Sequence, residues 1–364
     1  MTTFLASLNL LPSSSPAANF RTGEWTFPTL YSTLAPAALA DLVFSRYEID
    51  MPKNCQFWHR GLSDVYLLET LTTPYILRVS HCHWRSKMEI DFELELLDYL
   101  DRSQVPVAAP IRSKNGDLSL EINAPEGKRY AVLFPYAPGG IAIGDIDIEQ
   151  AYHLGAIVAN LHRVTADFQP LAYRHPLNLK YLLEDSLQII APFLHQRPSD
   201  LDCVLETIGE IEEETAKLPT ESPYWSICWG DPHSGNVHIT PDNQMTLFDF
   251  DQCGYGWRIF DIAKFLQVSL QSGLNRQVRH GFIQGYDQTV PLTEGELSCL
   301  QYLTQAAYIW SWSISLNNLR LTDYSRLCAN YFSSRLAILK RLRTQIKVGS
   351  NNMKEASAAG AAIF

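Results

Sequence analysis

The sequence predicts an α+β fold with two lobes, a small β-rich N-lobe followed by a larger, mainly helical C-lobe. The chain has 364 residues, which is too many for one ordinary hydrophobic core. Short alternating apolar runs separated by turn residues dominate up to about residue 135. Beyond about residue 145, apolar residues recur at helical spacing instead. The change in periodicity therefore marks two structural halves.

The N-lobe is expected to contain an antiparallel sheet and one helix. Two strands joined by a Gly-Leu-Ser-Asp turn are predicted by CQFWHRGLSDVYLLET, and a third strand is predicted by PYILRVSH. An amphipathic helix is predicted by RSKMEIDFELELLDYLDRS, because its apolar residues share one face opposite a charged face. The sheet is expected to be completed by VPVAAPIRSKNGDLSL and KRYAVLFPYAPGG.

The C-lobe is expected to be helical around two short β-type runs. Helices are predicted by DIEQAYHLGAIVANLHRV, with Asp147 as its N-cap, by LKYLLEDSLQIIAPFLHQR and by DLDCVLETIGEIEEETAKL. Four further helical segments are expected between residues 257 and 346. These patterns divide the chain into a flexible arm (1–35), the N-lobe (36–135), the C-lobe (136–346) and a frayed tail (347–364).

Composition excludes several classes of function. The chain is 46% hydrophobic and 19% charged, which is typical of a globular protein. A net charge of −10 argues against nucleic-acid binding, because phosphate neutralisation needs a basic surface. The seven cysteines are scattered and form no C-x-x-C pair, so a reducing, cytoplasmic location is expected. No apolar run approaches the roughly 18 residues that span a bilayer, so no membrane partner is expected.

Acidic and amide side chains follow the two β-type runs of the C-lobe, in ICWGDPHSGNVHI and MTLFDFDQCGYG. Asp231 is followed by Asn236 in the first stretch, and Asp249 stands in the second. Phosphoryl transfer from ATP needs a carboxylate near the attacking hydroxyl and a positioned Mg²⁺. Carboxylate and amide oxygens are the protein ligands that Mg²⁺ prefers. The pattern therefore predicts a kinase site.

These motifs resemble the aminoglycoside phosphotransferase (APH) family, whose fold is similar to that of protein kinases. Over residues 40 to 330 the chain looks most like the branch of type II homoserine kinase and the bacterial stress-response Ser/Thr kinases. The resemblance implies a bilobal protein-kinase-like fold with ATP and Mg²⁺ as cofactors. It assigns the catalytic base to Asp231, the metal ligands to Asn236 and Asp249, and supporting or structural roles behind them to His233, Asp251 and Asp261.

The same resemblance implies a nucleotide-binding set in the N-lobe. Gly61 and Ser63 lie in the turn that covers the phosphates, and Arg78 stands where the family has a phosphate-binding Lys. Glu93 on the predicted helix is the expected ion-pair partner of Arg78. Backbone groups from Phe134 to Tyr136 are expected to bind adenine.

Three tryptophans complete the site prediction. Trp229 occupies the position, two residues before the catalytic Asp, at which the family usually has His. Because that position packs against the loop, the change is expected to affect the geometry of the loop and not the metal chemistry. Trp310 and Trp312 on a late helix are expected either to pack in the core or to line the acceptor pocket.

We therefore expect an ATP- and Mg²⁺-dependent phosphotransferase acting on a hydroxyl of a small molecule, such as a homoserine-, choline- or sugar-like acceptor. The alternatives are a protein Ser/Thr kinase of the stress-response type and a catalytically weak nucleotide-binding protein, the latter suggested by Arg78 and Trp229. The basic excess of residues 300–346 favours an acceptor carrying a carboxylate or phosphate. The sequence leaves the oligomeric state open.

Overall fold

The computed structural model describes residues 27–142 and 145–357, with side chains to residue 344. The chain divides into two compact units. Unit 1 contains the described residues up to Lys87 together with Pro110–Tyr136. Unit 2 contains Met88–Ala109 and the described residues from Ala137 onward. The helix predicted within the N-lobe is therefore grouped almost entirely with unit 2.

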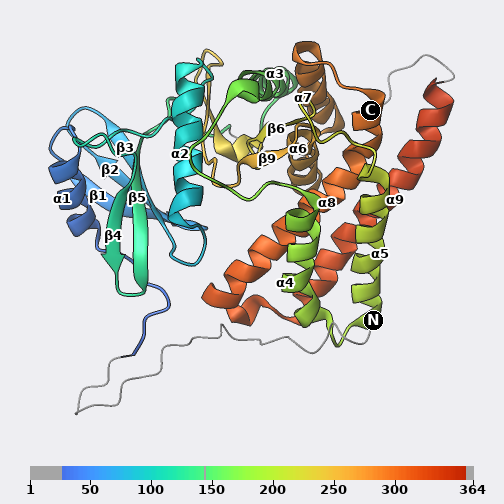
Figure 1. The fold of residues 1–364 in the computed structure, drawn as a ribbon, viewed down its shortest axis with the longest axis horizontal. Coiled ribbons are helices and arrows are strands. Elements are labelled where there is room, and N and C mark those ends of the chain that lie inside the picture. The colour runs from blue at the N-terminus through green and yellow to red at the C-terminus, as the bar shows by residue number, and fades with distance from the viewer. Residues whose placement is uncertain (1–26, 143–144, 358–364) are drawn as a thin grey trace. The chain divides into compact units, whose positions relative to one another are not determined.

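Unit 1 is built on one antiparallel sheet, with strand order β1-β2-β3-β5-β4 (Figure 1). The predicted hairpin forms the first two strands, and the third strand follows directly. The stretch from Val105 to residue 119, which we expected to be a strand, is mostly irregular, because its prolines cannot donate to a ladder. The strands are β1 Asn54–Arg60, β2 Ser63–Glu69, β3 Pro74–Ser80, β4 Leu120–Ala124 and β5 Gly127–Pro135.

A helix that the sequence analysis missed, α1 (Pro36–Arg46), packs in unit 1. Pro36 stands at its start, where the missing N–H costs nothing. Leu39 and Val43, four residues apart, are buried in one cluster with side chains of the sheet such as Leu77. The spacing of these two residues after a proline was the signal available in the sequence.

A buried ionic cluster lies in unit 1 around Asp64, the last residue of the Gly-Leu-Ser-Asp turn. Its side chain has no exposed surface and accepts hydrogen bonds from Arg129 Nη2 (2.9 Å) and Arg60 Nε (2.9 Å). The Tyr31 hydroxyl and the His81 ring also face the carboxylate. Burial raises the pKa of Asp64, but the hydrogen bonds from His81, Arg60 and Arg129 outweigh it and hold this pKa well below its usual range.

Unit 2 consists of helices and two short strand pairs. Asp147 caps its helix as predicted, through a capping box with Gln150. The last helix continues to Ser357, so it includes residues 347–357 of the expected tail; residues 358–364, like residues 1–26 of the expected arm, lie outside the described residues. The helices are α2 Lys87–Arg102, α3 Ile148–Val164, α4 Asp185–Leu194, α5 Pro198–Thr215, α6 Ile259–Ser272, α7 Arg276–Thr289, α8 Glu294–Thr322 and α9 Ala329–Ser357. Short turns of helix lie at Thr165–Asp167, Lys180–Glu184, Ser234–Asn236 and Tyr324–Arg326.

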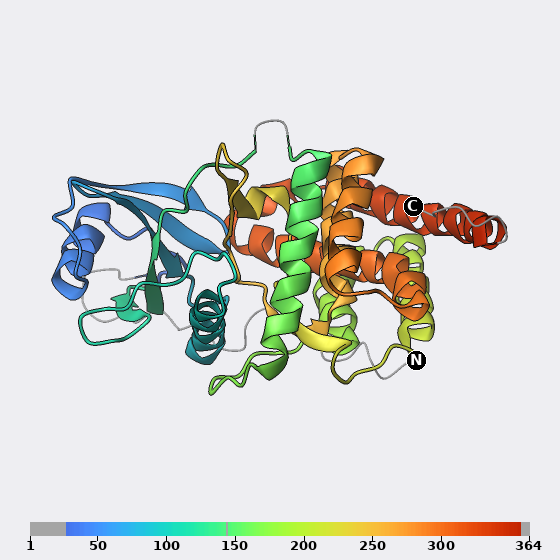
Figure 2. The same cartoon turned by 90° about the horizontal axis from the view of Figure 1, so that it is seen from above.

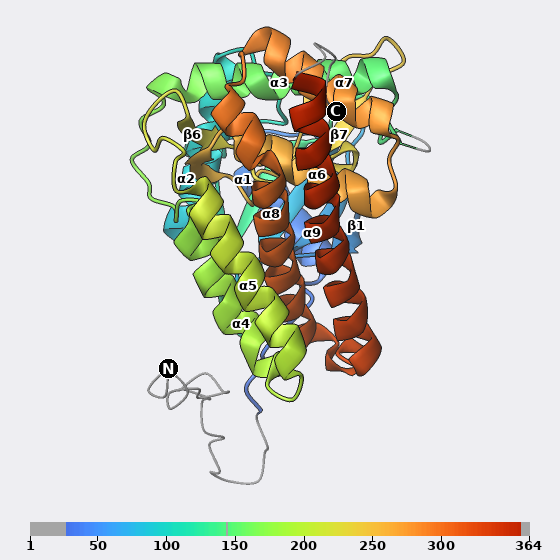
Figure 3. The same cartoon turned by 90° about the vertical axis from the view of Figure 1, so that its right-hand side faces the viewer.

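Helices α4, α5, α8 and α9 run side by side and share one core (Figure 3). Trp310 and Trp312 of α8 both belong to this core and are at most 2% exposed. A second helix pair, α3 and α7, also lies side by side (Figure 2). There, a Cβ added to Gly155 would overlap Phe282 O, and one added to Gly285 would overlap Tyr152 O. Because neither glycine carries a side chain, the backbones of α3 and α7 can come into direct contact at these two positions.

The β-type runs of unit 2 form two nested antiparallel pairs. The outer pair joins β6 (Trp225–Cys228) to β9 (Gly254–Trp257), and the inner pair joins β7 (Val237–Ile239) to β8 (Met245–Leu247). The two loops that connect the outer pair to the inner pair carry the predicted catalytic and metal residues. Within the described residues, no helix is long and apolar enough to cross a membrane.

Candidate active site

The first loop places Asp231 between a cation and two polar side chains. Its Oδ1 lies 3.3 Å from Lys264 Nζ on α6, and its Oδ2 accepts a hydrogen bond from Gln252 Nε2 at 3.0 Å. His233 Nε2 lies 3.7 Å from the same Oδ2. Burial raises the pKa of Asp231, but the Lys264 ammonium and the His233 ring outweigh it and lower this pKa to about 2. Asp231 is therefore a stable carboxylate, and its side chain remains 15% exposed.

His233 and Asn236 shape the turn that follows. His233 Nδ1 accepts the backbone N–H of Gly235 at 3.0 Å, so its ring proton sits on Nε2, the atom that faces Asp231. Asn236 Nδ2 donates to Asp231 O at 3.1 Å. Because the amide nitrogen is used in this way, Oδ1 is the Asn236 atom suited to a metal.

The second loop holds Asp249 in an unusual backbone conformation. Its φ is +58°, a left-handed value that Asp tolerates better than most residues. The preceding residue, Phe248, donates its backbone N–H to Asn236 O at 3.0 Å, so the two candidate metal ligands belong to adjoining segments. Asp249 is exposed, whereas Asn236 is buried. The described donor set is an amide oxygen and carboxylates, which fits a hard divalent cation.

Trp229 ties the two loops together. Its Nε1–H donates to Asp249 O at 3.2 Å, and its ring stacks on Phe250 with 5.4 Å between centroids. Both rings are fully buried. The next residue, Gly230, has φ +86°, and a Cβ there would overlap Gln252 O. The tryptophan thus provides a direct link between the base loop and the metal loop, at the position where the resemblance implies His.

Asp261 holds the start of the first loop through its two carboxylate oxygens. Its Oδ2 accepts the N–H of Trp229 and its Oδ1 accepts the N–H of Gly230, both at 2.8 Å. His162 Nε2 lies 2.9 Å from the same Oδ2, and Tyr286 on α7 holds the other nitrogen of that ring at 2.7 Å. This connects the α3–α7 pair to the catalytic loop.

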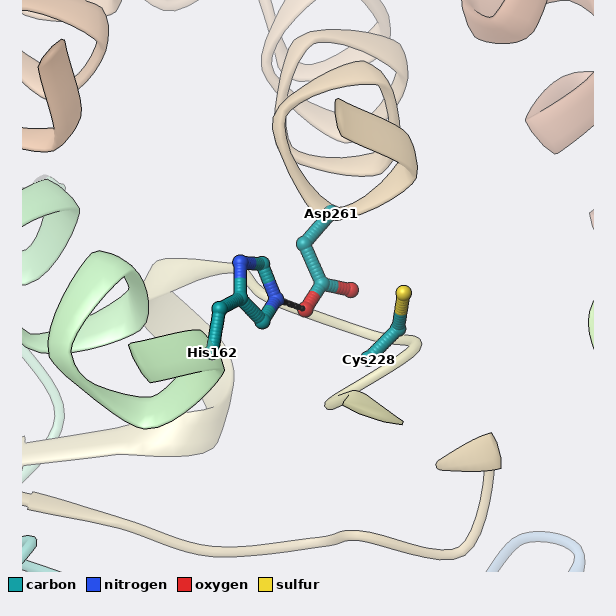
Figure 4. A group of neighbouring side chains, drawn as sticks. All are labelled: His162, Cys228 and Asp261. Carbon is teal, nitrogen blue, oxygen red and sulfur yellow. Dashed lines mark hydrogen bonds and ion pairs between the residues drawn. The ribbon is translucent and has the colours of Figure 1, made fainter. Parts of the chain in front are cut away.

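His162, Asp261 and Cys228 have the composition of a metal site, with one ligand atom of each within 4.8 Å of the others (Figure 4). Their atoms are already committed, since both carboxylate oxygens of Asp261 accept backbone N–H groups and the Cys228 thiol faces Trp257 O at 3.2 Å. Burial raises the pKa of Cys228 well above its usual range, which keeps the thiol protonated. We therefore assign this cluster a structural role.

Two positively charged residues that the sequence analysis missed support the loops. Arg174, only 3% exposed, donates to Asp251 O and to Cys253 Sγ. Lys264, also 3% exposed, contacts Asp231 from three residues beyond Asp261. No local sequence pattern identifies either residue as part of the site. Lys264 lies among residues of α6 that are mostly buried. Asp251 is itself buried.

Trp310 contacts Lys264, the lysine beside Asp231: the Lys264 ammonium lies 5.5 Å from the centroid of the Trp310 ring. Trp312 is fully buried in the helical core. Contact of either residue with an acceptor stays a prediction. Of the basic residues of α9, Arg343 pairs with Glu206 and Glu210 of α5. An acceptor that carries a carboxylate or phosphate stays a prediction.

The predicted nucleotide-binding residues fall in different units. Gly61, Ser63, Arg78 and Phe134 belong to unit 1, where the Arg78 guanidinium lies 5.1 Å from the centroid of the Phe134 ring. Tyr136 donates its backbone N–H to Pro74 O at 3.2 Å. Glu93 is buried on α2 in unit 2. The Arg78–Glu93 pair and the adenine contacts stay predictions.

Residues 55–297 match the sequence profile of a family described as the phosphotransferase enzyme family, APH. The uncharacterized protein sll1119 of Synechocystis sp. is 58% identical over 331 residues, which cover 91% of this chain and 92% of the relative. The homoserine kinase of Neisseria meningitidis serogroup B is 26% identical over 250 residues, which cover 68% of this chain and 77% of the kinase.

Solved structures share the fold. The amicoumacin kinase hAmiN, in complex with AMP-PNP, Ca²⁺ and Ami, superimposes with a TM-score of 0.69 at 23% identity, covering 85% of this chain and 92% of the kinase. This likeness confirms the predicted fold class, a protein-kinase-like arrangement of an antiparallel sheet and a helical part.

Proposed function

Because the chain belongs to the phosphotransferase enzyme family, we propose that this phosphotransferase is an ATP- and Mg²⁺-dependent kinase for a hydroxyl of a small molecule. The observation that supports the proposal most directly is the Asp231 carboxylate, which is held ionised in the same loop as Asn236, while Asp249 belongs to the adjoining loop. The relatives agree, since one is named homoserine kinase and another was solved with a nucleotide analogue and a divalent cation.

In the proposed reaction the acceptor hydroxyl donates a hydrogen bond to Asp231. The hydroxyl oxygen attacks the γ-phosphorus of ATP, the new P–O bond forms, and the bond from that phosphorus to the bridging oxygen of ADP breaks. The hydroxyl proton passes to the Asp231 carboxylate and from there to water. With a pKa of about 2, Asp231 is a weak base, so it orients the hydroxyl and takes the proton late, as a loose transition state requires.

Asn236 Oδ1 and the Asp249 carboxylate would hold the Mg²⁺. When bound, the cation would supply positive charge that neutralises the charge developing on the phosphate oxygens. The chain's own residues fix the two ligands: Phe248 N–H bonds Asn236 O, and Trp229 Nε1–H bonds Asp249 O. That second bond also argues against the alternative of a catalytically weak binding protein, which rested in part on Trp229.

The test is ADP release from Mg-ATP with a panel of acceptors that includes homoserine, choline, amino alcohols and sugars, beside a generic protein substrate. We expect turnover with one class of small hydroxyl compound and loss of that turnover in Asp231→Asn. Phosphorylation of the protein substrate alone would favour the stress-response kinase alternative. Nucleotide binding without transfer to any acceptor would overturn the proposal.

A further inference from the structure

Residues Tyr31–Thr33, which we call the strap, lie across one end of the sheet of unit 1. The sequence analysis places them in an expected flexible arm; in the structure they contact charged side chains of the sheet. At this end, Arg60 is the last residue of β1, Asp64 stands near the start of β2, and Arg129 stands near the start of β5. The strap therefore borders the turn that joins β1 to β2.

Tyr31 contacts both of the charged residues between which this turn closes. Its hydroxyl donates to Asp64 Oδ1 at 3.2 Å, and its oxygen lies 2.9 Å from His81 Nε2. The Arg60 guanidinium lies 4.2 Å from the centroid of the Tyr31 ring and pairs with Asp64 across the turn at 2.9 Å. Burial and the Asp64 charge raise the pKa of Tyr31, so the hydroxyl keeps its proton. The side chains on either side of residues 61–63 are thus both held by Tyr31.

The other two residues of the strap fix its position along the end of the sheet. The Ser32 hydroxyl donates to Glu126 Oε2 at 2.6 Å, in the turn between β4 and β5. Ser32 O accepts a hydrogen bond from Arg129 Nη1 at 3.0 Å, and the Arg129 side chain has no exposed surface. Thr33 Oγ1 accepts a hydrogen bond from Arg60 Nη2. Every residue of the strap therefore contacts a charged side chain, and Tyr31 is held in place from its C-terminal side.

We propose that Tyr31 is a positioning residue for the nucleotide: it holds the β1–β2 turn in the conformation that covers the phosphates. This inference rests on the proposed function and on the expected role of Gly61 and Ser63 in the same turn. A turn that is ordered in advance binds its ligand without the entropy cost of being ordered at each binding event. Loss of that order at about one residue corresponds to a roughly tenfold loss of affinity.

The experiment measures the order of the turn separately from nucleotide binding, in the full-length chain. Tyr31→Phe loses the hydroxyl and keeps the ring beside Arg60, whereas Tyr31→Ala loses both. The control Ser45→Ala removes a hydrogen bond of α1 in the same unit, from Ser45 Oγ to Leu42 O at 2.7 Å. Hydrogen exchange of residues 59–66, followed by mass spectrometry without nucleotide, reports the order of the turn. Calorimetric titration with Mg-ATP gives Kd, and steady-state kinetics give kcat and the KM of each substrate.

We expect faster exchange of residues 59–66 in both Tyr31 variants. The Kd for Mg-ATP and the KM for ATP should rise roughly tenfold in Tyr31→Ala and by a smaller factor in Tyr31→Phe. The KM for the acceptor and kcat at saturating ATP should stay near the wild-type values, and Ser45→Ala should match wild type throughout.

Unchanged exchange of the turn in the Tyr31 variants overturns the inference and leaves the kinase function intact. An unchanged Kd for Mg-ATP, with or without a fall in kcat, also overturns it and assigns Tyr31 a structural role. Tyr31→Phe decides by the same readouts where Tyr31→Ala does not fold. A wild-type protein that binds no Mg-ATP overturns the proposed function and this inference with it.

Discussion

Asp231 has little basicity of its own, because Lys264 and His233 hold its pKa at about 2. Its contribution to the proposed reaction is then mostly geometric: two oxygens, each held by a neighbour, present their remaining lone pairs to a hydroxyl. Gln252 and Lys264 are the neighbours that fix the carboxylate, one on each oxygen.

For Asp231→Asn we expect turnover to fall by about a hundredfold or more, the usual scale for loss of a general base. Nucleotide affinity should survive, since Asn236 and Asp249 remain. Steady-state kinetics with the best acceptor, together with calorimetric titration of Mg-ATP, measure the two effects. Equal loss of nucleotide affinity and turnover would mean that Asp231 belongs to the nucleotide site instead.

Asp64 provides a test of a buried charge in unit 1. Its pKa in the folded protein lies below the value of about 3.9 in an unfolded chain, so its contribution to stability is fully present above about pH 4 and is lost as the pH falls toward the lower folded value. We expect Asp64→Asn to cost about 1–3 kcal/mol at pH 7, because it removes the carboxylate 2.9 Å from the buried Arg129 and leaves Glu126, at 3.5 Å, as its remaining charged partner. Urea unfolding at pH 7 and pH 3 should show a smaller difference between wild type and variant at pH 3.

At the scale of elements, the glycine contacts between α3 and α7 position the brace of the catalytic loop. We expect Gly285→Ala to destabilise the protein by about 1–3 kcal/mol, because the added Cβ must push against the Tyr152 backbone. It should also lower turnover, since Tyr286 on α7 holds the His162 ring on α3, and that ring in turn contacts Asp261.

The matched control is Gly209→Ala on α5, where an added Cβ meets nothing within 4 Å. This substitution should leave turnover unchanged and be neutral or stabilising by up to about 1 kcal/mol. Thermal unfolding and kinetics of both variants check the prediction. Equal behaviour of the two alanine variants would show that α3 and α7 can separate without cost.

The sequence predicted most elements because their patterns are local. Alternation and helical spacing identified the strands of the sheet and the main helices, and the loop motif identified Asp231, Asn236 and Asp249 as candidates. The environment of the base was not predictable in this way, because Lys264 and Arg174 reach the loops from other elements and Gln252 reaches Asp231 from the opposite loop. Nor does any local pattern show that β6 pairs with β9 while β7 pairs with β8.

For the whole molecule, the proposed function predicts linkage between ligand and stability. Mg-ATP at a hundred times its Kd should add about 2.7 kcal/mol to the free energy of unfolding, and the midpoint of thermal unfolding should rise. In Asp249→Asn the rise should largely disappear when Mg²⁺ is present, because the carboxylate proposed to hold the metal is lost. Differential scanning fluorimetry with ATP, with and without EDTA, separates the metal-dependent part. An undiminished shift in the variant would remove Asp249 from the metal site.

Nesting of the two strand pairs sets an order in which the site can assemble during folding. The inner hairpin encloses only residues 240–244, so its closure costs little chain entropy, and the bond from Phe248 N–H to Asn236 O extends it to the candidate metal ligands. The outer pair brings Gln252 to Asp231 and encloses a longer segment than the inner pair does. The entropy cost of closing it is smaller once the inner hairpin has formed, because that hairpin shortens the flexible part of the segment. We expect pulsed hydrogen exchange during refolding to protect β7 and β8 amides no later than those of β6 and β9. A chain caught between these stages would have its metal ligands adjacent and its base unsupported, so cation binding would appear in refolding before catalysis does.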